Sequence, residues 1–329
     1  MATILSKAEK SYIVTSLTSS PPLRQDGRAP HDYRIISVIT GDEVAPLANG
    51  SAKIRVGGTE VVSAVRLEVE DLTSTDAHKG RIRCNVTCSP AAYPHLNGNQ
   101  QDDIQSDLTS ILQATFTSND GSTSTTPTFL HQMSETLTIL PGRKAWLLNL
   151  DAVVLSDGGN VYDVLFMACR AALWNTRVPK TRAVEYRDPT QKGVAGEKTI
   201  NNDVEMTDLW KSSVQTKKAT KAADFELEDY WDHGEPLAGR ARCPIAITLN
   251  LLPTVHILDA TRTEEQAVPL KLVIIYSFSQ DGDACFAGMR MLGPGDLPLE
   301  YLKGLLGEGE KYAKNLILSL DSQLKTQWS

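Results

Sequence analysis

The sequence predicts an α+β fold. Strand patterns joined by tight hairpin turns occur in both halves of the chain, and in each half a helical pattern follows them. Strands and helices do not alternate one by one, as they would in a doubly wound parallel sheet. At 329 residues the chain is long enough to bury a substantial core, in one large domain or two smaller ones.

A helix is predicted near the start of the chain. Ser6 and Glu9 have the spacing of a capping box, in which each side chain satisfies a backbone N–H of the first turn. The consecutive prolines of Ser19–Pro22 cannot continue a helix and therefore end it. The apolar face at helical spacing consists of Tyr12, Ile13 and Leu17. Residues 1–30 are thus expected to form a helix and a lead-in segment.

Strand patterns follow this helix. Residues 52–56 alternate between apolar and polar, Gly57-Gly58 provides a hairpin turn, and Val61–Val69 returns. Arg81–Cys88 alternates cleanly, which is typical of a half-buried strand. Its polar face consists of Arg81, Arg83, Asn85 and Thr87.

The middle of the chain combines a helix, a strand and a second helix. Asp102–Phe116 has an apolar stripe at helical spacing, Ala145–Leu155 is an apolar strand, and Val161–Trp174 is an apolar helix. Ser118–Thr126, rich in Ser, Thr, Asn and Gly, is predicted to be a polar loop.

Residues 181–240 differ from the rest of the chain. They are polar and charged and lack a sustained period, so we expect an extended, partly disordered insertion. Strand patterns resume at Pro244 as two hairpins, and a long helix with apolar residues from Leu302 to Leu320 closes the sequence. The four strand patterns are Ile245–Leu252, Val255–Leu258, Leu270–Phe278 and Cys285–Met291.

Composition argues against several classes of protein. With 33 Lys and Arg against 40 Asp and Glu, the net charge of -7 disfavours a broad basic surface that wraps nucleic acid. The sequence has neither an apolar signal core nor a segment of bilayer-spanning length, so we expect an intracellular, soluble protein without membrane contact. Phosphate loops, Gly-x-Ser-x-Gly elbows and His-Glu-x-x-His motifs do not occur.

The five cysteines include no Cys-x-x-Cys pair. We expect them to be small buried hydrophobic residues in a reducing compartment. Cys84 and Cys88 share one strand face and His95 is nearby, so a metal site is the alternative there, but no metal or other cofactor is predicted. The remaining cysteines are Cys169, Cys243 and Cys285.

The segment from Leu147 to Tyr162 carries the most informative motif. An apolar strand runs into Asp157-Gly158-Gly159 and then directly into a helix. A helix N-terminus after a glycine turn presents several unpaired backbone N–H groups, which can bind an anion. The alternative is a tight turn between strand and helix that Asn160 caps.

This turn resembles the phosphate-binding turn of the ribonuclease PH family, which degrades RNA by phosphorolysis. Other segments are similar to the opening helix of that family and to its Arg-x-Asp-Gly-Arg signature. The similar segments are Leu5–Ile13, Leu23–Arg28, Gly50–Ala52, Gly57–Val61 and Ala171–Pro179. The resemblance implies the ribonuclease PH fold, which is like ribosomal protein S-five domain two. Its two related halves would be residues 31–180 and 241–329, on either side of the insertion.

Active members of the family have three charged features, and this sequence departs from each. After Gly158 and Gly159 stand Asn160 and Val161, where active members have Ser or Thr and then the Arg that holds phosphate, so this phosphate site is degenerate. In the segment that matches an RNA-gripping Arg pair, residues 100–107, carboxylates would repel a phosphodiester chain. Arg242 stands where active members have a catalytic acid, and Arg can neither deprotonate nor bind Mg²⁺.

Basic side chains are the remaining candidates for RNA contact. We predict Arg81 and Arg83 on one strand face, and Arg240 and Arg242 beside the lost acid, although charges on a strand are usually only solvated. Arg24–Arg28 is expected to lock a turn through local ion pairs and not to bind substrate.

The resemblance implies a catalytically inert ring subunit of the eukaryotic RNA exosome, in the nucleus, including the nucleolus, and the cytoplasm. Its partners would be other ribonuclease PH-like ring subunits, RNA-binding cap subunits, a separate hydrolytic exoribonuclease and the RNA in the channel. The alternative is a phosphorolytic 3′→5′ exoribonuclease that shares a composite site with a neighbouring subunit. The negative net charge and the lack of an aromatic and basic motif disfavour a free RNA-binding module.

Overall fold

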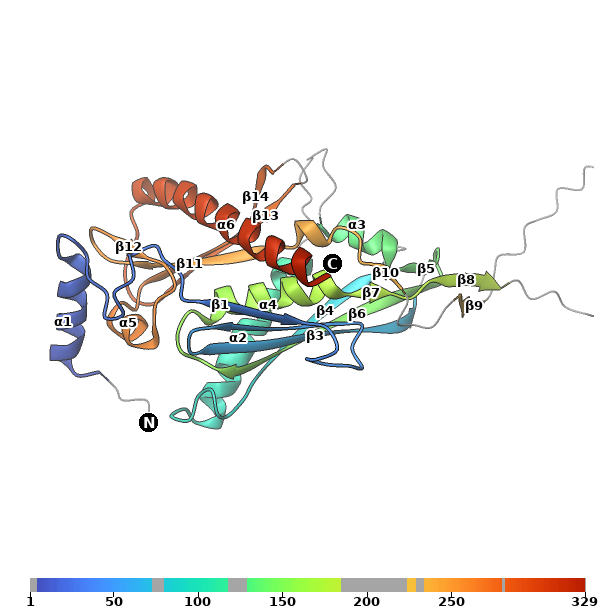
Figure 1. The fold of residues 1–329 in the computed structure, drawn as a ribbon, viewed down its shortest axis with the longest axis horizontal. Coiled ribbons are helices and arrows are strands. Elements are labelled where there is room, and N and C mark those ends of the chain that lie inside the picture. The colour runs from blue at the N-terminus through green and yellow to red at the C-terminus, as the bar shows by residue number, and fades with distance from the viewer. Residues whose placement is uncertain are drawn as a thin grey trace, which may run out of the picture.

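Two main β-sheets, with helices around and between them, form the described part of the molecule (Figure 1). The computed structural model describes residues 5–72, 80–117, 129–184, 224–228, 234–279 and 282–328. The first half of the chain builds a six-stranded sheet and the second half builds a four-stranded sheet. This architecture is the α+β fold that the sequence predicts.

The larger sheet has the order β1-β2-β3-β6-β4, and β5 pairs with β6 outside this path. Its pairs are antiparallel except that of β4 with β6, which is parallel and therefore needs a crossover. The crossover contains α2 (Gly98–Thr117) and α3 (Phe129–Thr136), of which α3 was not predicted. The strands are β1 (Ile36–Thr40), β2 (Gly50–Val56), β3 (Thr59–Asp71), β4 (Arg81–Cys88), β5 (Thr138–Leu140) and β6 (Lys144–Ser156).

The smaller sheet has the order β12-β11-β13-β14 and is antiparallel throughout. Its two hairpins are those that the sequence predicts. The long closing helix α6 (Leu299–Trp328) is also confirmed, and it packs on β11 and β13. The strands are β11 (Ile245–Leu251), β12 (His256–Ile257), β13 (Lys271–Phe278) and β14 (Ala284–Leu292).

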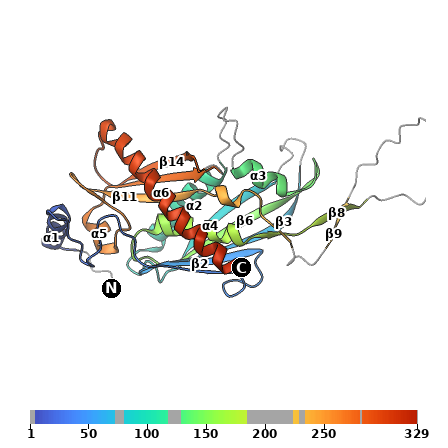
Figure 2. The same ribbon diagram turned by 45° about the horizontal axis from the view of Figure 1, so that its top comes forward.

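The helix α4 (Val161–Asn175) lies at the centre of the fold. It packs against β2 and β3 of the larger sheet and against β11 of the smaller one, and its residues from Asp163 to Trp174 are all buried. Figures 1 and 2 show α6 crossing over α4. An ion pair of 2.9 Å between the fully buried Arg170 and Asp321 joins the two helices. The helix that follows the glycine turn is therefore buried along most of its length.

The first helix, α1 (Lys7–Thr18), begins with the predicted capping box. Ile13 and Leu17 are buried beside α5 (Arg262–Ala267), a short helix that was not predicted. Tyr12 is 69% exposed, so its assignment to the buried face is wrong. Residues 13 and 17 are four apart and share a face, whereas residue 12 is turned away from it.

The expected insertion is paired at both of its ends. β8 (Thr181–Val184) pairs with β9 (Asp224–Leu227), and β7 (Arg177–Val178) pairs with β10 (Glu235–Pro236). Residues 185–223 and 229–233 lie outside the described residues, as do those of the predicted loop Ser118–Thr126.

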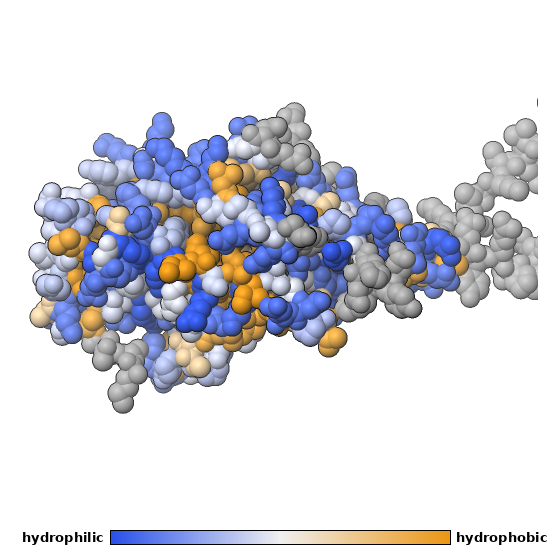
Figure 3. Space-filling view, viewed as in Figure 1, coloured by the Kyte–Doolittle hydropathy of each residue, from blue (hydrophilic) through white to orange (hydrophobic). Residues whose placement is uncertain are grey.

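Hydrophobic side chains are not confined to the core. Figure 3 shows them gathered in the middle of the face that α6 crosses, among hydrophilic neighbours. The strongly exposed large apolar side chains of the molecule include those of Ile35, Leu47, Leu299 and Leu318. Patches of exposed apolar surface mark interaction sites. Within the described residues no helix has both the length and the apolar character needed to cross a bilayer.

Candidate functional site

The glycine turn connects the end of β6 to the start of α4. Gly159 has φ +100° and Asn160 has φ 63°, both in the left-handed region. A Cβ on Gly159 would lie 2.4 Å from the backbone oxygen of Ala260. This position therefore requires glycine, both for its conformation and for the close approach of the second half of the chain.

Three backbone N–H groups of the turn have acceptors within the chain. Gly158 N–H donates to Thr59 Oγ1 at 3.0 Å, and Gly159 N–H donates to Asp157 Oδ1 at 2.9 Å. Asn160 N–H donates to Glu265 Oε1 at 3.0 Å. Two of these acceptors are carboxylates, which is the charge that a helix N-terminus favours. An external anion would have to displace them.

Glu265 comes from α5, which a capping box between Thr261 and Glu264 begins. Its carboxylate also pairs with the ammonium group of Lys271, at 2.7 Å, and both side chains are largely buried. The Glu265 carboxylate therefore lies next to the glycine turn, and its charge is balanced by the Lys271 ammonium group. Neither residue was predicted as part of the site, although Thr261 and Glu264 have the spacing of a capping box in the sequence.

Asn160 does not cap α4 with its side chain, so that expectation is wrong. Its Nδ2 instead donates to Asp163 Oδ2 at 3.1 Å and to Asp259 Oδ1 at 3.0 Å. Val161, the second residue after the two glycines, is half-buried and contributes no charge. The Asn160 side chain thus bonds buried groups of the molecule and does not cap the helix.

Asp259 and Asp163 form a buried acidic centre below the turn. Arg34 holds Asp259 with Nη2 to Oδ1 at 2.6 Å and Nε to Oδ2 at 2.8 Å, and Arg28 adds an ion pair at 3.1 Å. Asp163 accepts hydrogen bonds only from neutral donors in the described residues: Tyr33, Thr248 and Asn160. Burial raises the pKa of Asp163 to about 7.

The Arg24–Arg28 segment is tied to the second half of the chain. Arg28 pairs locally with Asp26 at 2.7 Å, as predicted. Arg24 instead reaches Glu264 at 2.7 Å, with both side chains buried. The prediction of local ion pairs is therefore correct for Arg28 and wrong for Arg24, which pairs with a residue of the second half of the chain.

Arg240 and Arg242 lie in a 3-10 helix at the opposite end of α4. Arg240 Nη1 donates to Trp174 O at 2.9 Å, and Arg170 donates to Ala241 O at 3.0 Å. Trp174 is roughly 20 Å along the helix axis from Asn160. Arg242 and the glycine turn therefore lie at opposite ends of α4, and the acid that faces the turn is Glu265.

Arg81 and Arg83 share the exposed face of β4, as predicted. Arg81 pairs with Glu70 at 2.7 Å. At α2, Asp107 pairs with Arg290 of β14 and accepts from Tyr162 at 2.9 Å, while Asp102 and Asp103 are exposed. The four arginines thus lie in two separate groups, on β4 and at the far end of α4.

Four of the cysteines, Cys84, Cys88, Cys169 and Cys243, are buried as expected. Cys285 is exposed, so the expectation is wrong for this residue. In the part of the chain that the structure describes, no three His, Cys, Asp or Glu side chains are placed to hold a metal ion.

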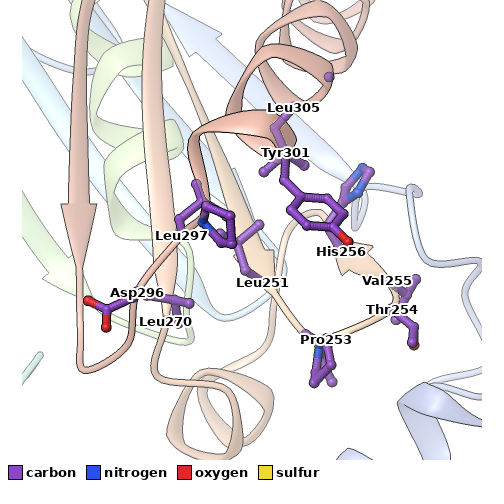
Figure 4. Close-up of a pocket in the computed structure, with 13 residues that line it drawn as sticks. Leu251, Pro253, Thr254, Val255, His256, Leu270, Asp296, Leu297, Tyr301 and Leu305 are labelled. Carbon is purple, nitrogen blue, oxygen red and sulfur yellow. The ribbon is translucent and has the colours of Figure 1, made fainter.

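A separate cavity of about 580 Å³ lies between the start of α6 and the turn from β11 to β12. Figure 4 shows Tyr301 reaching from α6 toward the turn that carries Pro253 and Val255. The walls of this cavity are mostly leucine and proline side chains. Asp296 and His256 are the two ionisable residues other than Tyr301 that line it. An apolar cavity with a single carboxylate does not attract a phosphate chain.

A protein family and two individual relatives are similar in sequence to this chain. Residues 32–179 match the RNase PH family, described as "3' exoribonuclease family, domain 1". "Exosome complex component Rrp42" of Sulfurisphaera tokodaii is 33% identical over 196 residues, covering 60% of this chain and 65% of the relative. "Putative exosome complex exonuclease RRP42" of Dictyostelium discoideum is 27% identical over 234 residues, covering 56% and 68%. The chain thus matches just under two thirds of the length of the first relative.

Solved structures share the fold. The "archaeoglobus fulgidus exosome with RNA bound to the active site" contains a chain that superposes with a TM-score of 0.64 at 20% identity, covering 96% of this chain and 97% of that one. A chain of an "Archaeal exosome core" gives a TM-score of 0.62 at 19% identity, covering 95% and 96%. The predicted ribonuclease PH fold is confirmed by these matches. Archaeal and eukaryotic relatives both match, so a eukaryotic origin stays a prediction.

Proposed function

We propose that this chain, a member of the RNase PH family through residues 32–179, is a ring subunit of an RNA exosome core that supports 3′→5′ RNA processing and degradation. The names of its relatives support this role, and so does the fold that it shares with chains of solved exosomes. Exposed Ile35, Leu47 and Leu318 provide the apolar surface that assembly with other subunits requires.

We further propose that the subunit is catalytically inert. The observation that carries this is the hydrogen bond between the Glu265 carboxylate and Asn160 N–H. Phosphorolysis needs inorganic phosphate next to the RNA end. A carboxylate in the phosphate's place repels that anion, and Val161 supplies no cation to compensate. Lys271 does not help, because Glu265 already neutralises it.

The remaining contribution to RNA degradation is to contact and guide RNA. Arg81 and Arg83 on β4 are exposed, and Arg240 and Arg242 are half-buried. We propose that these arginines contact the phosphate backbone. The subunit would sit between other ribonuclease PH-like subunits, carry RNA-binding cap subunits and lead RNA to a separate hydrolytic exoribonuclease. In a eukaryotic cell we expect it in the nucleus, the nucleolus and the cytoplasm.

A phosphorolysis assay tests the proposal. The purified chain, alone and reconstituted with its co-purifying subunits, is incubated with uniformly labelled single-stranded RNA, Mg²⁺ and either phosphate or none. We expect a stable multi-subunit particle and no nucleoside diphosphate that depends on this chain. Phosphate-dependent release of nucleoside diphosphates that requires this chain would instead support a composite phosphorolytic site.

A binding assay tests the arginines separately. Replacing Arg81 and Arg83 by Gln in the reconstituted particle should weaken RNA binding and reduce its dependence on salt. Arg55→Gln/Arg66→Gln, which changes two exposed arginines on β2 and β3, is the matched control. Equal affinity of all three particles at low salt would remove β4 from the RNA path.

A further inference from the structure

The helix α2 is bonded to the backbone of β4 through its side chains. Three strand N–H groups find their acceptors on this helix. The bonds join Cys84 N to Gln113 Oε1 at 2.6 Å, Val86 N to Thr109 Oγ1 at 3.1 Å and Cys88 N to Gln105 Oε1 at 3.1 Å. Strand carbonyls are bonded as well, by Gln101 to Cys88 O at 2.5 Å, by Thr109 to Val86 O at 3.4 Å and by Gln113 to Ile82 O at 3.4 Å.

The side chains Gln101, Gln105, Thr109 and Gln113, the α2 ladder, recur every four residues. Four residues of an α-helix rise about 6.0 Å, and two residues of a strand rise about 6.6 Å. One polar side chain per helical turn therefore meets one outward-facing backbone position of β4 after another. The helix runs antiparallel to the strand, because residue 101 lies at Cys88 and residue 113 at Ile82.

β4 is an edge strand of the larger sheet. Its one strand neighbour is β6, in the part of the chain that the structure describes. In a parallel pair, alternate residues point both backbone groups at the neighbour and the others point them away. The α2 ladder takes the groups that point away, at residues 82, 84, 86 and 88. Unpaired groups along an edge strand otherwise attract strands of other chains.

We propose that the α2 ladder acts as a surrogate neighbouring strand that closes the β4 edge to pairing with strands of other chains. A glutamine amide carries a donor and an acceptor, as a peptide group does, so it can replace both groups of a missing strand. Contacts with other subunits then use other surfaces. The closure depends on the fold alone, whether or not the chain joins an exosome ring.

The edge strand of the smaller sheet is a contrast. β14 has nine residues, and among the described residues no side chain bonds its backbone edge. It also exposes Phe286, Met289 and Met291. The edge strands β4 and β14 therefore differ: a row of polar helix side chains lies along β4, and the described residues place none along β14.

The variant Gln105→Leu/Thr109→Val/Gln113→Leu tests the closure, because it keeps side-chain size and the apolar face of α2. At low protein concentration, amide exchange in residues 81–88 should become about fivefold faster, since each lost hydrogen bond contributes about 1 kcal/mol. The neighbouring strand β6, residues 144–156, should stay protected. At high concentration, sedimentation velocity should show self-association beyond that of the wild type.

The matched control is Ser110→Leu/Ala114→Leu, which adds apolar surface on the exposed side of α2 without touching the ladder. Unchanged exchange in residues 81–88 of the triple variant would overturn the proposal. So would faster exchange without any added self-association, or equal self-association of the control. Should the triple variant not fold, the single variant Thr109→Val is measured instead. The proposal then requires faster amide exchange at Val86 in this variant and the wild-type exchange rate at Val86 in the control.

Discussion

Glu265 and Asn160 are joined by a hydrogen bond of 3.0 Å between a side-chain carboxylate and a backbone N–H at the first turn of α4. The two residues are 105 positions apart in the sequence. A helix N-terminus is a favourable place for an anion, and here the chain supplies that anion itself. The backbone N–H of Asn160, which could bind an external anion, is therefore used to join two distant parts of the chain.

Removing the Glu265 carboxylate should destabilise the protein. Glu265→Ala leaves Lys271 and Asn160 N–H without this acceptor, and we expect the free energy of unfolding to fall by about 1–3 kcal/mol. Urea unfolding measures the change. Adding Lys271→Met to Glu265→Ala should recover part of the loss. A Glu265→Ala protein as stable as the wild type would show that the contact is incidental.

Gly159 should not tolerate a side chain. Its φ of +100° is unfavourable for other residues, and a Cβ would meet the backbone of Ala260 and Thr261, which cannot rotate away. Gly159→Ala is expected to cost at least about 2 kcal/mol. The control is Gly304→Ala on α6, where a Cβ meets nothing within 4 Å and helix propensity predicts a gain of up to about 1 kcal/mol. Thermal unfolding of both variants compares them directly, and equal melting temperatures would contradict the steric argument.

The buried ion pair between Arg24 and Glu264 should be costly to break on one side only. Arg24→Met leaves a buried carboxylate without its cation, which typically costs about 3–5 kcal/mol. Glu264→Gln keeps an acceptor for Thr261 N–H but removes the charge. The double variant should therefore be more stable than the sum of the two single changes predicts. Strict additivity in a double-mutant cycle would rule out the coupling.

Asp163 should make stability depend on pH in an unusual direction. Its pKa is raised to about 7 by burial in the folded state, whereas an unfolded aspartate has a pKa of about 3.9. The folded state therefore holds the extra proton. The stabilising contribution of this group is complete below about pH 4 and is lost as pH rises through about 7. Asp163→Asn, which stays neutral, should gain stability relative to the wild type over this range.

Urea unfolding at several pH values between 4 and 8 measures this difference. Asp103→Asn, on the exposed side of α2, is the control and should follow the wild type throughout. Parallel stability curves for Asp163→Asn and the wild type would mean that Asp163 is already ionised across the range.

Local patterns in the sequence predicted most elements of the fold. The alternation of Arg81–Cys88 and the largely apolar sequence of α4 each lie within one element, so neighbouring residues alone are enough to predict them. The short helices α3 and α5 were missed, because eight and six residues carry little periodic signal. Tyr12 was wrongly assigned to the buried face, because it is apolar and adjoins Ile13 in the sequence, and helical spacing alone does not fix where the buried face ends.

The sequence by itself determined that the residues after the two glycines, Asn160 and Val161, bring no cation to the turn. Only the tertiary structure decided that Glu265 faces this turn and that Arg242 lies at the other end of α4. Sequence periods report on a few neighbouring residues, whereas these contacts depend on how two sheets pack around one buried helix. Partners about 70 to 105 positions apart become neighbours only through that packing.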